Sequence, residues 1–201
     1  MSTTPDLLFS FLLFVVIATL SPGGATALTT ASGAQFGFRR SLPLIAGIAL
    51  GLATLAAASA AGLASLVLAL PSLQMALKGV GSVYLVWLAW KIARSGRPSL
   101  ESKNEKPLTF ASGVMLLWLN PKGWTMTLSA AASFAMIAAS PAKLAALLGA
   151  TFGVSATLSL SVWCVAGLLL ARVLRTELHW RLTNAALGLL LAASIAPIWW
   201  T

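Results

Sequence analysis

The sequence TLSPGG at residues 19–24 interrupts an apolar segment that must cross a membrane. The apolar stretch before it, residues 7–20, would form a helix of about 21 Å, shorter than the roughly 30 Å hydrocarbon core, so the helix has to resume after Gly24. Pro22 cannot donate to the carbonyl of Ala18, and it steers Ser21 away from helical dihedrals. Because broken backbone at membrane depth is tolerated only beside protein or a wet cavity, this break is the first candidate functional site.

Composition places the whole chain, residues 1–201, in one transmembrane domain. Of its 201 residues, 59% are hydrophobic and 8% are charged, against about 25% charged in a typical soluble domain. Its mean hydropathy is +0.92. We predict an all-α polytopic membrane protein whose first segment is retained, because Asp6 stands where a signal peptide carries Lys or Arg. Pro43 suits the first turn of the second helix. The six expected spans are about 7–31, 43–70, 73–90, 110–137, 144–170 and 185–200.

The net charge of +9 reflects topology rather than nucleic-acid binding, because the cations lie between the apolar segments. Lys143, with Lys78 able to reach towards it, falls on one face of the membrane. Ten others fall on the opposite face, which the charge rule makes cytoplasmic, so both termini are expected outside. These ten are Arg39, Arg40, Lys91, Arg94, Arg97, Lys103, Lys106, Arg172, Arg175 and Arg181.

The break at residues 19–24 has a counterpart, WLNPKG, at residues 118–123. The following helices also correspond, since GIALG at 47–51 matches GATFG at 149–153. We therefore predict two three-helix repeats, about 5–93 and 108–201. Because three is odd, the second repeat is inverted, with helices 1 and 4 broken near the midplane. Gly-x-x-x-Gly and Pro also serve packing alone, and the two glycine pairs are expected to be close-approach faces.

Each break is expected to present free carbonyls before it, around residues 17–18 and 115–117, and free N–H groups after it, around residues 24–26 and 123–125. Carbonyls attract cations and N–H groups attract anions. A small zwitterion such as an amino acid matches that pair. The candidate substrate-binding residues are Ser21, Pro22, Gly23, Gly24, Asn120, Pro121, Lys122 and Tyr84.

Lys122 is the one charged residue deep in a predicted span, and two readings of it stay open. In one reading, Lys122 binds the substrate carboxylate. In the other, its ammonium group reaches carbonyls freed by Pro121 or extends towards a membrane interface. Tyr84, one turn from Trp87, either lines a pathway or simply packs. The four acidic residues lie near surfaces or in loops, and Cys164 is alone. We therefore expect no metal site, no cofactor, no carboxylate proton relay and no enzyme activity.

With these residues in hand, the chain resembles the LysE/RhtB family of amino-acid exporters over nearly its whole length. The resemblance rests on SPG at 21–23, GFRR at 37–40 with GIALG at 47–51, GSVYLVWLAWK at 81–91, and NPK at 120–122. The sequence around residues 84–93 is most similar to that of the branch exporting cysteine and O-acetylserine. In the family pattern a second proline and a polar residue follow SPG, where this chain has Gly24 and Ala25, and Ser41 replaces a glycine.

The resemblance implies export of amino acids or their derivatives from the bacterial cytoplasm across the inner membrane. It implies an ion gradient as the driving force, with H⁺ or Na⁺ as the coupling ion, and it leaves homo-oligomerisation open. Two alternatives remain from the residues alone. One is an exporter of another small organic or inorganic solute. The other is a non-transporting membrane scaffold, which would not require two broken helices at equivalent positions.

Overall fold

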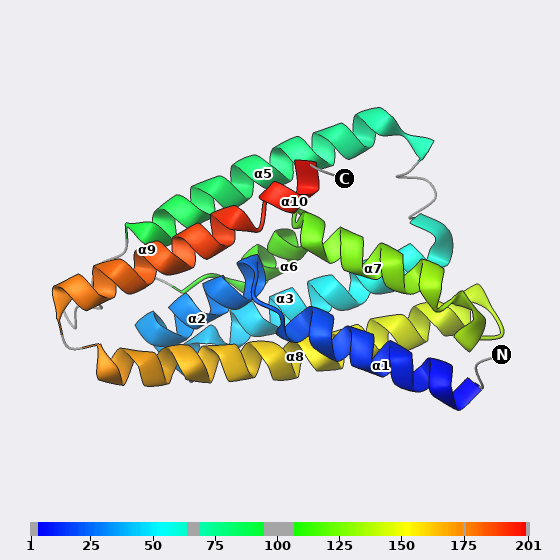
Figure 1. The fold of residues 1–201 in the computed structure, drawn as a ribbon, viewed down its shortest axis with the longest axis horizontal. Coiled ribbons are helices and arrows are strands. Elements are labelled where there is room, and N and C mark those ends of the chain that lie inside the picture. The colour runs from blue at the N-terminus through cyan, green and yellow to red at the C-terminus, as the bar shows by residue number, and fades with distance from the viewer. Residues whose placement is uncertain (1–3, 64–68, 95–106, 175, 200–201) are drawn as a thin grey trace.

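In the computed structural model the described residues, 4–63, 69–94, 107–174 and 176–199, form helices joined by short connections, and none of them lies in a β-strand. The chain runs back and forth along one long axis (Figure 1). Two helices, α5 (Pro71–Ala93) and α9 (Glu177–Ala193), lie side by side along one edge and run in opposite directions. The remaining long helices pack beside this pair, so the fold is a helical bundle.

Both predicted breaks are confirmed. The first predicted span corresponds to α1 (Thr4–Leu20) and α2 (Gly24–Phe36), which are bent by 53° across Ser21, Pro22 and Gly23. The fourth predicted span corresponds to α6 (Phe110–Trp118) and α7 (Pro121–Ser133), separated by Leu119 and Asn120. A short 3-10 turn, η2 (Ala135–Ile137), follows α7.

The second predicted span begins earlier than expected. Helix α3 (Phe38–Ala58) continues into a π-helical turn, η1 (Ser59–Leu63), which carries Gly62 at φ 102°. Its start is set by Gly37, whose φ of 79° separates α2 from α3 and is accessible because glycine has no Cβ. Pro43 lies inside α3, so the prediction that it occupies the first turn was wrong.

The last predicted span also begins earlier. The fifth is α8 (Pro141–Val173), and α9 starts only a few residues later, followed by α10 (Ala196–Trp199). Thr176 caps α9 because its Oγ1 accepts the N–H of His179 at 3.2 Å. Trp180 is buried and donates to the carbonyl of Leu174 at 3.2 Å. Both His179 and Trp180 therefore belong to α9, ahead of the predicted span 185–200.

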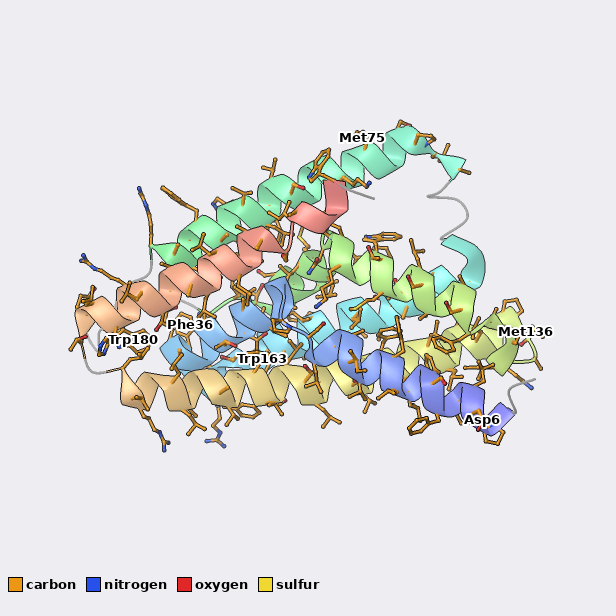
Figure 2. The ribbon with its side chains drawn as sticks, viewed as in Figure 1. Asp6, Phe36, Met75, Met136, Trp163 and Trp180 are labelled. Atoms are coloured by element: carbon orange, nitrogen blue, oxygen red, sulfur yellow. The ribbon has the colours of Figure 1, made fainter. Side chains whose placement is uncertain are left out.

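The outward surface is strongly apolar. Phe9, Val83 and Val162 are 69%, 72% and 62% exposed, and Met75 points away from the bundle (Figure 2). A soluble protein rarely exposes apolar area on this scale. Two helical stretches, Phe38–Gly62 and Pro141–Val173, are by themselves long and apolar enough to cross a membrane. The bent pair of α1 and α2 adds a third. The chain is a multi-pass membrane protein, and six spans stay a prediction.

Glycines mark where helix backbones touch. Gly47 of α3 lies against the carbonyl of Phe110 in α6, and Gly149 and Gly153 of α8 lie against Ala53 of α3. The predicted close-approach faces are thus confirmed. Gly81 of α5 lies against the carbonyl of Leu119, which places α5 on the second break. Small residues let helices approach this closely when lipid supplies no hydrophobic drive.

Helix α8 also covers the carbonyl end of α1. Its Ser159 hydroxyl donates to the carbonyl of Thr19 at 2.8 Å, and the Trp163 indole donates to that of Leu20 at 3.2 Å. One turn earlier, Ser155 Oγ lies 2.7 Å from Thr19 Oγ1. Figure 2 shows Trp163 between α8 and the break. Ser159 and Trp163 therefore replace two of the backbone donors that α1 lacks beyond its last turn, and Ser155 contacts the Thr19 hydroxyl.

We expect Gly81→Ala to destabilise the fold, because the new Cβ would collide with the Leu119 carbonyl. Overpacking of this kind costs about 1–3 kcal/mol. Thermal unfolding of the purified protein in detergent measures the effect. Gly79→Ala is the matched control, since a Cβ there meets nothing within 4 Å. Equal melting temperatures for the two variants would contradict this packing.

We expect Ser159→Ala to lower stability by about 1–3 kcal/mol, the cost of leaving a buried carbonyl unpaired. The readout is again thermal unfolding in detergent. Ser161→Ala on the same helix is the control, because no described residue forms a hydrogen bond with the Ser161 side chain. A Ser159→Ala variant as stable as Ser161→Ala would show that the Thr19 carbonyl needs no donor.

Candidate functional site

The carbonyls that precede the first break are not free. Ile17 accepts the N–H of Ser21 at 3.0 Å, and Ala18 accepts the Ser21 hydroxyl at 2.9 Å. With Thr19 and Leu20 paired to α8, every carbonyl of the last turn of α1 has a donor. The prediction of unpaired carbonyls around residues 17–18 was therefore wrong. Side chains supply the donors that Pro22 removes from the backbone.

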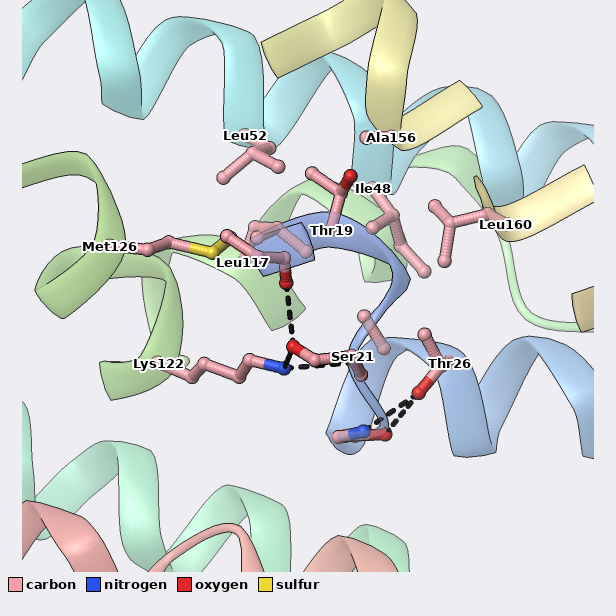
Figure 3. Close-up of a pocket in the computed structure, with 14 residues that line it drawn as sticks. Thr19, Ser21, Thr26, Ile48, Leu52, Leu117, Lys122, Met126, Ala156 and Leu160 are labelled. Atoms are coloured by element: carbon pink, nitrogen blue, oxygen red, sulfur yellow. Dashed lines mark hydrogen bonds between the residues drawn. The ribbon is translucent and has the colours of Figure 1, made fainter. Parts of the chain in front are cut away.

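Lys122 crosses from the second break to the first. Its Nζ donates to Ser21 Oγ at 2.8 Å, to the Ser21 carbonyl at 3.0 Å and to the Pro22 carbonyl at 3.2 Å. An ammonium has three donors, so all three are used here. Figure 3 shows the extended side chain reaching the connection between α1 and α2. Lys122 therefore joins the two breaks, one from each half of the sequence.

The start of α2 is organised differently. Thr26 Oγ1 accepts the N–H of Gly23 at 2.8 Å and donates to the Gly23 carbonyl at 2.9 Å. Gly23 has no side chain with which to return a cap, and none of the described residues accepts a hydrogen bond from the N–H groups of Gly24, Ala25 or Thr26. Three N–H groups at the positive end of a helix form an anion-binding cradle.

The second break is closed by its own residues. Asn120 is buried, and its Oδ1 accepts the N–H of Lys122 at 3.0 Å. Met115 and Leu117 accept the N–H groups of Leu119 and Asn120 at 2.9 and 3.1 Å, and the Trp124 indole donates to the Trp118 carbonyl at 2.8 Å. The prediction of free carbonyls around residues 115–117 was thus wrong for Met115 and Leu117. Nor is the N–H of Gly123 free, since it donates to the Asn120 carbonyl at 2.9 Å.

A cavity of about 40 Å³ lies beside the first break, room for roughly three water molecules. Its polar wall is the break itself together with the Lys122 side chain, and its apolar wall comes from α3, α6, α7 and α8 (Figure 3). The remaining wall residues include Ile48, Leu52, Leu117, Met126, Ala156 and Leu160. No carboxylate is among the residues that the structure places on its surface.

Four of the eight predicted binding residues line this cavity: Ser21, Gly23, Gly24 and Lys122. Pro22 contributes through its carbonyl, and Asn120 and Pro121 shape the helix start that carries Lys122. Tyr84 does not reach the cavity wall, and its ring stacks on Trp87 with centroids 5.9 Å apart. It lies one turn from Gly81, the residue that touches the second break.

Sequence reasoning missed Thr26, Ser159 and Trp163. Thr26 stands three residues after Gly23, the spacing at which a side chain reaches back to the first residue of a helix start. Ser155, Ser159 and Trp163 repeat every four residues along an apolar helix, which places three polar groups on one face. This spacing of polar residues on an apolar helix indicates that the face packs against a segment whose backbone needs hydrogen-bond donors.

The arrangement suits binding rather than bond chemistry. It offers N–H donors, a cation and an apolar wall. The one hydroxyl beside the cation, Ser21 Oγ, accepts a hydrogen bond from the Lys122 ammonium at 2.8 Å, and an ammonium cannot act as a base. Among the described residues, no three His, Cys, Asp or Glu side chains gather where they could hold a metal ion. Groups of this kind suit the recognition of charge on a small solute.

Comparison with known proteins agrees with this geometry. A family model described as LysE type translocator matches residues 16–194. Proteins named cysteine/O-acetylserine efflux protein, from Escherichia coli K12 and from Shigella sonnei Ss046, are each 30% identical over 189 residues. The alignment covers 94% of this chain and 95% of each relative. No solved structure matches the chain. The chain therefore belongs to the LysE type translocator family, and it is a transporter rather than an enzyme.

Proposed function

We propose that six segments cross the bacterial inner membrane as two inverted repeats, residues 5–93 and 108–201. Counterpart segments run in opposite directions in Figure 1, as an inverted repeat requires. The packing supports the same symmetry: α3 packs on its counterpart α8, and α5 on its counterpart α9. The first broken span packs on α8, and the second broken span packs on α3. A two-fold axis relating the repeats would produce this pattern, because it maps each broken span onto the other and α3 onto α8.

The orientation follows from charge. The start of α3 (Arg39, Arg40), the end of α5 (Lys91, Arg94) and the end of α8 (Arg172) gather at one end of the bundle, together with the start of α9 (Figure 1). Four further cations of the predicted set, at 97, 103, 106 and 175, lie outside the described residues. An excess of Lys and Arg favours the cytoplasmic side, so both termini face the periplasm.

The transported solute is a small amino acid or amino-acid derivative, carried out of the cytoplasm. The observation that carries this proposal is the cavity between the two breaks, which has free N–H groups and an ammonium on one side and apolar walls elsewhere. N–H groups at a helix start bind a carboxylate, and a broken helix beside a cavity is the usual place for a transporter site.

At about 40 Å³ the cavity holds only a few water molecules, so binding of an amino acid requires it to widen. The relatives named for efflux of cysteine and O-acetylserine point to the same class. The coupling ion, H⁺ or Na⁺, stays a prediction from the resemblance, as does homo-oligomerisation.

Overproduction is expected to raise amino-acid efflux. Cells carrying the gene, or an empty vector, are loaded with dipeptides, and amino acids and O-acetylated derivatives in the medium are quantified over time. We expect faster appearance of at least one small amino acid or derivative. If none leaves faster than in the empty-vector cells, amino-acid export is refuted.

We expect Lys122→Ala to reduce this efflux at least about tenfold, because it removes a charge and three charge-assisted hydrogen bonds. Membrane insertion, measured by blotting of the membrane fraction, should be unchanged. Lys143→Ala is the control, since it removes the same charge from an exposed position at the start of α8. Wild-type efflux in Lys122→Ala would make Lys122 dispensable for transport.

A further inference from the structure

The connection between α1 and α2 holds a cation site that is already occupied. Ser21 Oγ, the Ser21 carbonyl and the Pro22 carbonyl surround one ammonium group at 2.8–3.2 Å. That ammonium belongs to Lys122, a hundred residues away in the sequence (Figure 3). Three oxygens at hydrogen-bond distance are what any primary ammonium requires, whether it belongs to the protein or to a solute.

The site owes its negative character to the backbone. Ser21 and Pro22 follow the carbonyl end of α1, where the helix dipole places partial negative charge. Gly23 leaves room for the cation, because a Cβ there would lie 3.1 Å from Lys122 Nζ. The three oxygens therefore favour a positive charge independently of where that charge comes from.

Lys122 has no alternative anionic partner at the cavity. From α3 and α8 the wall receives Ile48, Leu52, Ala156 and Leu160, none of which can pair with an ammonium. An ammonium displaced from the three oxygens would therefore be unpaired in a poorly solvated site, which is strongly unfavourable. Anything that displaces Lys122 has to bring an anion with it.

We propose that the three oxygens of Ser21 and Pro22 are the subsite for the ammonium group of the transported substrate, and that Lys122 fills this subsite while the transporter is empty. This inference rests on the proposed export of amino acids. On binding, the substrate ammonium replaces the Lys122 ammonium on the oxygens. The substrate carboxylate is then bound by the released Lys122 and by the N–H groups at the start of α2.

The exchange explains selectivity for zwitterions. The Lys122 ammonium leaves the three oxygens as the substrate ammonium arrives. The substrate carboxylate then pairs with the released Lys122. An amine without a carboxylate leaves Lys122 unpaired, and an acid without an ammonium leaves the oxygens to Lys122. The exchange also releases the link between the two breaks, so that substrate binding loosens the contact between α7 and the connection of α1 with α2.

The first experiment tests the cation subsite without using any substrate. Lys122→Ala and Lys122→Met are purified in detergent and their thermal unfolding is followed with increasing n-butylammonium chloride. We expect both variants to melt below the wild type, and n-butylammonium to raise their melting temperature with saturation, since a ligand of the folded state stabilises it. Wild type, Lys143→Ala and 1-butanol at equal concentration are the controls and should show no such shift. The absence of a saturable shift in both variants would overturn the subsite.

The second experiment tests the exchange with three compounds of similar size: L-cysteine, its decarboxylated amine cysteamine, and its deaminated acid 3-mercaptopropionate. Binding is measured by calorimetry under reducing conditions. Wild type should prefer L-cysteine to cysteamine by at least about tenfold, because the amine leaves an ammonium unpaired. In Lys122→Met this preference should fall to about twofold, since the oxygens are then vacant for either compound.

One result would overturn the exchange and make Lys122 a permanent carboxylate ligand. In that result Lys122→Met loses binding of L-cysteine and of 3-mercaptopropionate to the same extent, and cysteamine still does not bind. Failure of the proposed function looks different. In that case wild type neither binds nor exports amino acids, while n-butylammonium still stabilises the Lys122 variants.

Discussion

The carbonyl oxygens of residues 19–22 lack backbone donors, and much of the structure around the first break supplies them with partners. Pro22 has no N–H, and in the part of the chain that the structure describes the N–H groups of Gly24, Ala25 and Thr26 donate to none of these carbonyls. An unpaired backbone group in a membrane costs several kcal/mol. Helix α8 therefore brings Ser159 and Trp163, and α7 brings Lys122. The position of α8 against α1 and α2, and that of α7 across the cavity, both follow from this requirement.

The two breaks meet the same requirement by different means. Asn120 and Trp124 supply hydrogen bonds to the second break from within its own segment. The first break depends on α7 and α8 for its donors, and it keeps three N–H groups free. Hydrogen-bond donors that come from another helix can be replaced by donors of a solute when that helix moves. Donors from within the same segment stay in place. The two breaks thus differ in the source of their hydrogen-bond donors.

The sequence predicted both breaks, the close-approach glycines and the family resemblance, because Pro and Gly act locally and leave a readable pattern. It predicted Lys122 as a candidate without choosing between its two readings. What it could not predict was the pairing of Lys122 with Ser21 and Pro22, since an ammonium a hundred residues away carries no local mark. The starts of α3 and α9 were also missed. Gly37, which precedes α3, adopts a positive φ that only its tertiary setting requires. Thr176 caps α9, so that this helix begins before the apolar run.

The departure from the resembled family pattern at Gly24 has a physical consequence at this site. Gly24 is the first residue of α2, a position where proline fits and would remove one N–H from the cradle. Glycine keeps that N–H. It also lets Leu191 of α9 approach, since a Cβ on Gly24 would lie 2.6 Å from Leu191 Cδ1. Helix α9 therefore packs against the start of α2, and through its contact with α5 it connects the anion cradle to the side of the bundle that touches Leu119. The first break is thus held by α7 and α8 at its carbonyl end and by α9 at its N–H end, and all three helices come from the second half of the chain.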